Sequence, residues 1–393
     1  MGTNPIILYP TSVFDGHSGT ECASHLAEYL SSYIAHAFKA ATPDTPTQDT
    51  LKAAFNLMDS HLLDGHFPVI QKPYSATDVL TNLRPAMAGA CALVSYINKN
   101  DLFVACVGDS RAVLGVLGDD GKSISAVQLT DDQTCQNTSE YRRIIEEHPG
   151  EESSVIRRNR VLGGLMPTRA FGDSRYKWPV SIQQIISAFT KRRVPDSLKT
   201  PPYVTAEPVV TQHALTKKDQ FLIMATDGIW DELSSDEAVR IVWQWMQTQK
   251  SLKNNSSPSD AIAEIPDASK YTRGRFRWSF EDDNAATSLL RNSLGGADSI
   301  RVGRLLGIPA PTARKFRDDM TVTVLFLDVQ DEYSPTPEQR PWWKVWGRGK
   351  AHTPGLRSVD DEKVKKGEGH LPQWMNLLQR YMAVQPETSV KGG

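Results

Sequence analysis

Three aspartates in this sequence share one setting, at the end of an apolar run rich in β-forming residues. Asp15 follows such a run and precedes Gly16, Asp227 follows another, and Asp318 comes just before a third. Because strand ends are rigid, they can hold carboxylates in a fixed relation. Mg²⁺ and Mn²⁺ prefer such oxygen ligands. Two such ions, roughly 3.5–4 Å apart, can clamp a phosphoryl group for in-line attack. The pattern therefore indicates phosphoryl chemistry.

Spacing alone leaves simpler interpretations open for each residue. Asp-Gly is a common turn, so Asp15 and Asp227 could be turn residues. Asp132, which follows a further apolar run, could be a metal ligand or a helix cap. His17, two residues beyond Asp15, could protonate a departing alkoxide or could merely cap a helix.

The elements that must position these residues are strands and helices in alternation. Apolar spacing predicts helices over 19–38, 48–63, 139–147 and 235–248, and two short helices over 285–306. It predicts strands over 6–14, 88–97, 102–107, 112–117, 221–225 and 321–327. The strands 102–107 and 112–117 should pair as a hairpin across residues 108–111. These patterns favour antiparallel sheets stacked on each other with helices outside.

Composition narrows the class of protein. The 393 residues are 39% hydrophobic and 23% charged, which is typical of a globular domain with a sizeable core. A net charge of −2 gives no basic field for nucleic acid, and no apolar run approaches the roughly 20 residues of a membrane helix. The four cysteines are widely spaced, which favours reduced thiols over a disulfide framework.

Five short motifs, in order, resemble those of the metal-dependent protein phosphatases (the PPM, or type 2C, family). They are Val-Phe-Asp-Gly-His-Ser-Gly at 13–19, Val-Gly-Asp-Ser-Arg-Ala at 107–112, Arg-Ala-Phe-Gly-Asp at 169–173, Ala-Thr-Asp-Gly-Ile-Trp-Asp at 225–231 and Asp-Asp-Met-Thr at 318–321. The resemblance covers residues 13–327. It implies an α+β fold, a four-layer α-β-β-α sandwich of two mainly antiparallel sheets with flanking helices and a metal site between the sheets.

The resemblance also assigns site residues by position. It implies two Mg²⁺ or Mn²⁺ ions and a weaker third, with His17 as the general acid. Asp15 would bridge two ions, and Asp132 with Asp227 would hold the third. The metal ligands implied are Asp15, the Gly16 carbonyl, Asp132, Asp227 and Asp318.

Within the family, the stretches 136–149, 160–178 and 284–292 resemble the pyruvate dehydrogenase phosphatases. This implies hydrolysis of phosphoserine and phosphothreonine by metal-activated water, with the pyruvate dehydrogenase complex as the phosphorylated protein partner. It also implies a mitochondrial location, although no transit peptide is visible in the sequence. The segment Ser174–Tyr203 is either a docking loop for this large substrate or a structural flap.

The ends of the chain carry two further expectations. Family members have an Arg and a Glu-Asp pair before the Asp-Gly-His motif, whereas residues 1–12 here carry no charge. The first strand and the acidic pair are therefore expected to be missing, and a catalytically weak or inactive binding protein is the alternative function. A phosphatase domain over 1–330 should be followed by a Pro/Lys/Gly-rich tail over 331–393, with a short helix near 372–381.

Overall fold

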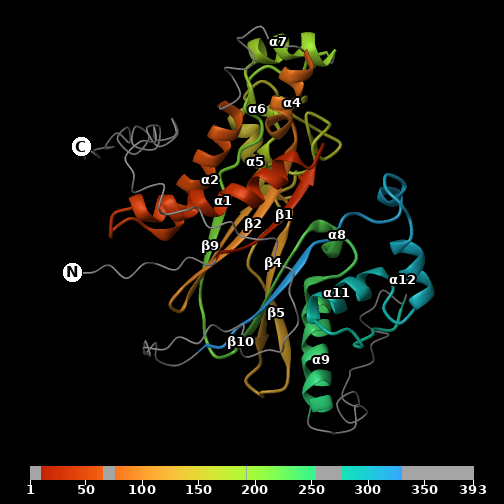
Figure 1. Ribbon diagram of the computed structural model, residues 1–393. Helices are drawn as coiled ribbons and strands as arrows, with labels where there is room; N and C mark the ends of the chain where they lie inside the picture. Colours follow the sequence, from red (N-terminus) through yellow and green to blue (C-terminus); the bar gives the residue numbers. More distant parts are fainter. Residues whose placement is uncertain (1–9, 65–75, 192, 254–275, 330–393) are drawn as a thin grey trace, which may run out of the picture. The chain divides into compact units, whose positions relative to one another are not determined.

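The structure, a computed structural model, describes residues 10–64, 76–191, 193–253 and 276–329 (Figure 1). The expected C-terminal tail and its short helix lie outside these residues, as does the start of the first predicted strand. Those two expectations stay predictions.

Two antiparallel sheets form the centre of the described chain. The first has the strand order β1 (Thr11–His17), β2 (Gly89–Asn98), β3 (Asp101–Val107) and β9 (Val209–Ala214), with β8 (Phe171–Gly172) also paired to β2. The second has the order β11 (Val322–Phe326), β10 (Asp219–Ala225), β4 (Arg111–Leu117) and β5 (Ile124–Gln128). A small ribbon joins β6 (Ile156–Arg157) and β7 (Arg160–Val161).

The helices confirm most of the predicted helical spacing. Those expected are α1 (Glu21–Ala40), α2 (Thr47–Asp64), α5 (Thr138–Glu147), α9 (Ser235–Lys253), α11 (Ala285–Leu294) and α12 (Ser299–Leu306). Those not predicted are α4 (Ala76–Met87), α6 (Ser174–Lys177), α7 (Val180–Thr190), α8 (Asp227–Trp230) and the 3-10 turn η2 (Thr312–Lys315). Among the described helices, none has the length and apolarity needed to cross a bilayer.

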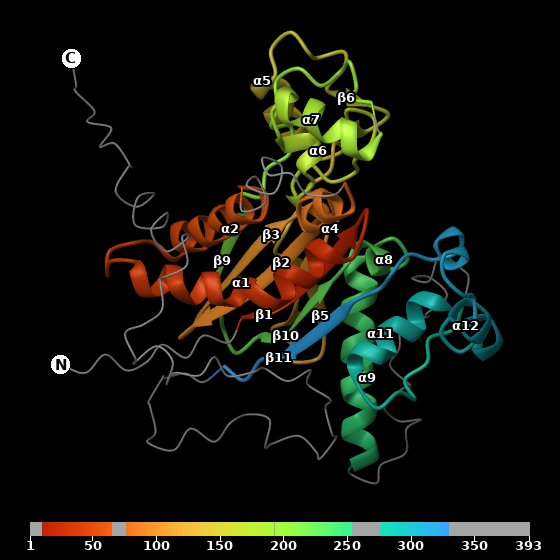
Figure 2. The same cartoon turned by 45° about the horizontal axis from the view of Figure 1, so that its top comes forward.

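Side chains alternate between two cores along each central strand, as a period of two requires. In β3, Leu102 and Val104 point between the sheets, while Phe103 and Ala105 pack against α1 and α2. The second sheet repeats the pattern, with alternate β10 side chains packed against α9 and α11. Figure 2 shows these helices covering the outer faces. The expected four-layer α-β-β-α sandwich is confirmed.

The predicted hairpin between residues 102–107 and 112–117 is wrong. The two segments form β3 and β4, which belong to different sheets: β3 pairs with β2 and β9, whereas β4 pairs with β10 and β5. Both strands are largely buried and each pairs with a strand on both of its edges, so each lies inside a sheet of its own and not in an isolated hairpin. Gly108, at φ +104°, lets the chain cross between the sheets. The chain returns to the first sheet between β5 and β8, and it crosses again between β9 and β10.

Candidate active site

The fold brings the three predicted aspartates to one end of the sandwich. Asp15 lies on β1, opposite Cys91 of β2. Asp227 begins α8 directly after β10, and Asp318 comes just before β11. Since β10 and β11 pair with Ala225 opposite Val322, their site-bearing ends lie side by side. The strand β1 contacts β10 across the two sheets.

Two small features lock the Asp227 and Asp318 segments together. The Thr226 hydroxyl donates to the carbonyl of Asp319 (3.3 Å) and accepts from the amide of Thr321 (3.0 Å). A Cβ on Gly228 would lie 2.5 Å from the carbonyl oxygen of Asp319. The Asp-Gly pair is therefore needed for close backbone approach, beyond any role as a turn.

Asp109, in the turn between β3 and β4, is a fourth carboxylate that sequence reasoning missed. It is buried, and the Cys91 thiol donates to its Oδ1 (3.2 Å). Burial raises the pKa of Asp109. Assigning residues 107–112 to a hairpin hid this residue. A buried acidic residue where the chain changes sheets was the signal that could have revealed it.

The clustered carboxylates perturb one another's protonation. Burial, together with the charges of Asp109 and Asp318, raises the pKa of Asp15 to about 6. Burial and the charges of Asp109 and Asp15 raise the pKa of Asp227 to about 8, and Asp227 hydrogen-bonds to Asp15. Each carboxyl therefore resists ionisation because it is buried and, in addition, because its neighbours are acidic.

This donor set suits a hard divalent cation. Carboxylates gathered at a half-buried site need positive charge, and Mg²⁺ and Mn²⁺ select oxygen ligands. No three acidic, histidine or cysteine side chains in the described residues converge as ligands of one ion. Mg²⁺ usually takes only one or two carboxylates and keeps several waters, so this arrangement fits a hydrated ion.

Asp132 stands apart from the other predicted ligands. The Arg111 guanidinium donates a hydrogen bond to each of its carboxylate oxygens, with Nε–Oδ1 at 2.9 Å and Nη2–Oδ2 at 2.6 Å. Burial raises the pKa of Asp231, and the charges of Asp318 and Asp132 add to this effect, so Asp132 lies near enough for the two charges to interact. A role for Asp132 in a third metal site stays a prediction, since Arg111 already neutralises it.

His17, the predicted general acid, is paired with a buried carboxylate. Its Nε2 lies 2.6 Å from Oδ2 of Asp173, at the start of α6. Burial alone would lower the pKa of His17, but the hydrogen bond and charge of Asp173 outweigh it and raise the pKa. The partner belongs to the 169–173 motif, whose spacing gave no hint of contact with His17.

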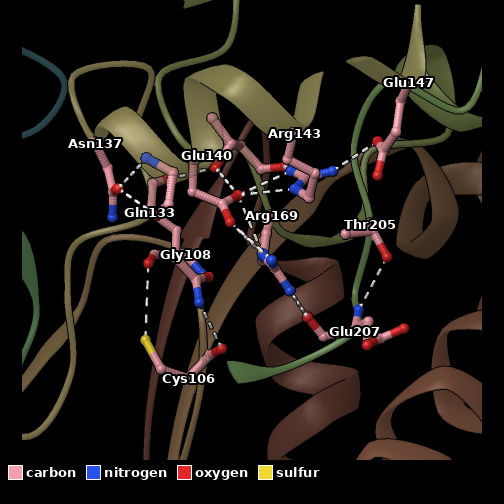
Figure 3. A network of polar contacts seen from close by, with 12 residues as sticks. Cys106, Gly108, Gln133, Asn137, Glu140, Arg143, Glu147, Arg169, Thr205 and Glu207 are labelled. Carbon is pink, nitrogen blue, oxygen red and sulfur yellow. Dashed lines mark hydrogen bonds and ion pairs between the residues drawn. The ribbon is translucent and has the colours of Figure 1, made fainter. Parts of the chain in front are cut away.

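A polar network links Gln133 to the turn that carries Asp109, and links Thr168 in turn to Gln133 (Figure 3). The side-chain amide of Gln133 accepts from the backbone N–H of Gly108 (2.7 Å) and donates to the backbone carbonyl of Cys106 (3.0 Å). The backbone carbonyl of Gln133 accepts from the Thr168 hydroxyl. The Glu140 carboxylate accepts from two guanidinium groups (Figure 3): Arg169 Nη2 lies 2.7 Å from its Oε1, and Arg143 Nη2 lies 2.8 Å from its Oε2. These bonds, chiefly those from Arg169, lower the pKa of Glu140 to about 2 despite its burial.

Without divalent ions, stability should fall as pH rises from about 4 to about 8. In this window the folded protein keeps protons on Asp227 and Asp15 that the unfolded chain, with an ordinary aspartate pKa of 3.8, has released. Glu140 is ionised throughout. Thermal unfolding in EDTA should show this decline, and excess Mn²⁺ should raise Tm more at pH 8 than at pH 5. A metal-free Tm that rises across the window would contradict the clustering.

Comparison with known proteins supports what the motifs suggested. Residues 9–271 match the family described as Protein phosphatase 2C. This chain belongs to the protein phosphatase 2C family. Its members are protein serine/threonine phosphatases. A protein phosphatase 2C homologue of Schizosaccharomyces pombe is 40% identical over 336 residues, covering 81% of this chain and 73% of that protein.

Further relatives extend the comparison. The mitochondrial pyruvate dehydrogenase (acetyl-transferring) phosphatase 1 of Saccharomyces cerevisiae is 35% identical over 357 residues, covering 81% of this chain and 62% of that protein. The solved structure of serine-threonine phosphatase 2C from Toxoplasma gondii covers 81% of this chain and 84% of its own at 16% identity, with a TM-score of 0.40. This chain therefore spans only part of the length of the curated relatives.

Proposed function

We propose that this protein hydrolyses phosphoserine and phosphothreonine in proteins, using two Mg²⁺ or Mn²⁺ ions held by Asp15, Asp227 and Asp318. The carrying observation is the cluster of mutually perturbed carboxylates, placed between two sheets and beside a histidine. When bound, such ions neutralise phosphate charge and lower the pKa of a coordinated water. Asp109 adds a fourth negative charge and strengthens the preference for divalent cations.

The chain's own residues would orient the reaction. Asp15 is fixed by the pairing of β1 with β2, and Asp227 begins α8 just after the paired strand β10, so the cation site has a preset geometry. His17 lies two residues beyond Asp15 at the end of β1, where it can hold a proton for the leaving serine or threonine oxygen. Asp132 paired with Arg111 would complete a weaker third site once that ion pair opens.

Phosphatase activity should depend on divalent ions. We expect EDTA to abolish phosphate release from a phosphothreonine peptide and Mn²⁺ or Mg²⁺ to restore it. His17→Gln should slow the peptide reaction by about 10²-fold, because alkoxide departure needs a proton, and should slow p-nitrophenyl phosphate hydrolysis much less. The measurement is kcat on both substrates at saturating Mn²⁺. Peptide binding without turnover at any metal concentration would favour the alternative of an inactive binding protein.

We further propose that the physiological substrate is phosphorylated pyruvate dehydrogenase, in mitochondria. The proposal is supported by the similarity to the yeast pyruvate dehydrogenase phosphatase 1 and by the three resembling stretches. The segment Ser174–Tyr203 contains the unpredicted helix α7, and two of its aromatic residues, Trp178 and Tyr203, are buried. They serve packing, so docking would have to use exposed groups such as Ile185 and Arg193.

Ile185→Lys should distinguish a docking surface from a structural flap. If α7 docks the dehydrogenase, kcat/KM on phosphorylated pyruvate dehydrogenase should fall roughly tenfold, the usual cost of one apolar contact at an interface, while a short phosphopeptide is unaffected. Leu252→Lys, which alters an exposed leucine at the end of α9, is the matched control. Equal rates on the dehydrogenase for both variants would leave α7 as a structural element only.

A further inference from the structure

We propose that Asp173 is a positioning residue for His17, and that Gly89 provides the space in which the two side chains meet. Together they would fix the imidazole with its Nε2–H bound to Asp173 and its Nδ1 presented to the leaving group. This inference rests on the proposed phosphatase function and adds a determinant of leaving-group protonation.

The pair is built on three adjacent strands. His17 lies opposite Gly89, and Gly89 lies opposite Gly172 of β8 on its other side. The residue that follows, Asp173, has φ +50° and its amide donates to the Ala88 carbonyl (2.9 Å). Both side chains therefore approach the same point above the middle strand.

That point is one where a side chain on the middle strand would stand. A Cβ on Gly89 would lie 2.0 Å from His17 Nε2 and 2.4 Å from Asp173 Oδ2. The backbone of Gly89 is not in the left-handed region, so alanine would be permitted by its conformation. The His17–Asp173 contact thus needs glycine here for space alone.

A buried ion pair anchors the segment that carries Asp173. The Lys177 amine lies 2.6 Å from Oδ2 of Asp59 and donates to the Ala170 carbonyl, also at 2.6 Å. The other oxygen of Asp59 accepts from the Gly172 amide (2.8 Å). Asp59 and Lys177 are each 8% exposed, so helix α2 holds both ends of the 170–177 segment rigidly.

This geometry specifies how the proton would move. As water attacks phosphorus and the P–O ester bond breaks, the proton on Nδ1 passes to the departing oxygen. The imidazole is left neutral with its remaining hydrogen on Nε2, where Asp173 accepts it. Solvent then returns a proton to Nδ1. A carboxylate in this position keeps the ring in one tautomer and one orientation, as does the aspartate that accepts a hydrogen bond from the catalytic histidine in a Ser-His-Asp triad.

The activity test compares two variants with a matched control. Asp173→Asn and Gly89→Ala should each lower kcat on a phosphoserine peptide by about 10²-fold, while p-nitrophenyl phosphate, whose leaving group needs no proton, loses no more than a few-fold. The control is Gly303→Ala in α12, where a Cβ would meet nothing within 4 Å. Equal losses on both substrates, or no loss on either, would overturn the proposal.

A second measurement does not depend on turnover. In the full chain labelled with ¹⁵N-histidine, His17, assigned by its loss in His17→Gln, should be protonated on Nε2 when neutral. In Gly89→Ala and Asp173→Asn this preference should disappear, while the other histidine signals stay. An unchanged His17 signal in both variants would refute the inference even if the enzyme is active. A wild-type protein with the expected signal but no activity would refute only the proposed function.

Discussion

Replacing Asp227 with asparagine is expected to abolish metal-dependent phosphatase activity while stabilising the metal-free protein. Asparagine removes a carboxylate from the cation site, so turnover should fall by at least about 10²-fold. This is more than the loss expected when a residue that only hydrogen-bonds to a metal ligand is changed. It also removes a group that the folded state ionises reluctantly, with a pKa of about 8, so Tm in EDTA at pH 7 should rise. Enzyme assays with Mn²⁺ and thermal unfolding in EDTA measure the two effects.

The opposite signs of these effects separate a ligand from a structural residue. Asp318→Asn should behave in the same way, since its charge acts on both Asp15 and Asp227. Asp283→Asn, which changes an exposed aspartate before α11, should alter neither activity nor Tm measurably. Full activity in Asp227→Asn would remove the basis for the site assignment.

Glu140→Gln should destabilise the protein by about 3–5 kcal/mol at pH 7. The change leaves the guanidinium groups of Arg169 and Arg143 without their shared buried counter-charge, which is a costly loss. Chemical denaturation in excess Mn²⁺ measures the difference in the free energy of unfolding.

The pH dependence of this difference has a definite sign. The folded pKa of Glu140 is about 2, below its ordinary 4.5, so its contribution is fully present above about pH 4.5 and is lost toward pH 2. The gap between the wild type and Glu140→Gln should narrow over that range. Glu147 lies on the same helix and also pairs with Arg143, but its side chain is half-exposed. Glu147→Gln should therefore lower the free energy of unfolding by under about 1 kcal/mol. Similar losses in the two variants would mean that the network of Figure 3 contributes little.

The layers of the fold were predictable because apolar spacing reports burial directly. The helices α1, α2 and α11 have one clear apolar stripe each, and the central strands are mostly apolar. Pairing was less accessible, because a strand buried on both faces, such as β3 or β4, carries no alternation that says which sheet it joins. Helix α7 was missed because its apolar residues lie within the segment 174–203, which is otherwise rich in polar residues, Trp and Arg.

The site was predictable where chemistry and sequence position coincide. Asp15 lies near the end of β1, Asp227 follows β10 and Asp318 precedes β11, so their convergence needed only that these strand ends meet at one end of the sandwich. Asp109 and Asp173 could not be reached in this way. Each acts through a partner distant in sequence, Cys91 or His17, and such contacts depend on tertiary packing that no local pattern encodes.

The chain crosses between the sheets three times, after β3, after β5 and after β9, so some strand edges stay unpaired until late in synthesis. Strand β9 completes the first sheet, and β10, only a few residues later, becomes the centre of the second. A nascent chain that has not yet reached Val209 thus carries β3 with one edge open and β4 without its principal partner. Such edges attract other strands, so the polypeptide is exposed to misassembly during this interval of synthesis. Emergence of residues 209–225 from the ribosome closes both edges in one step.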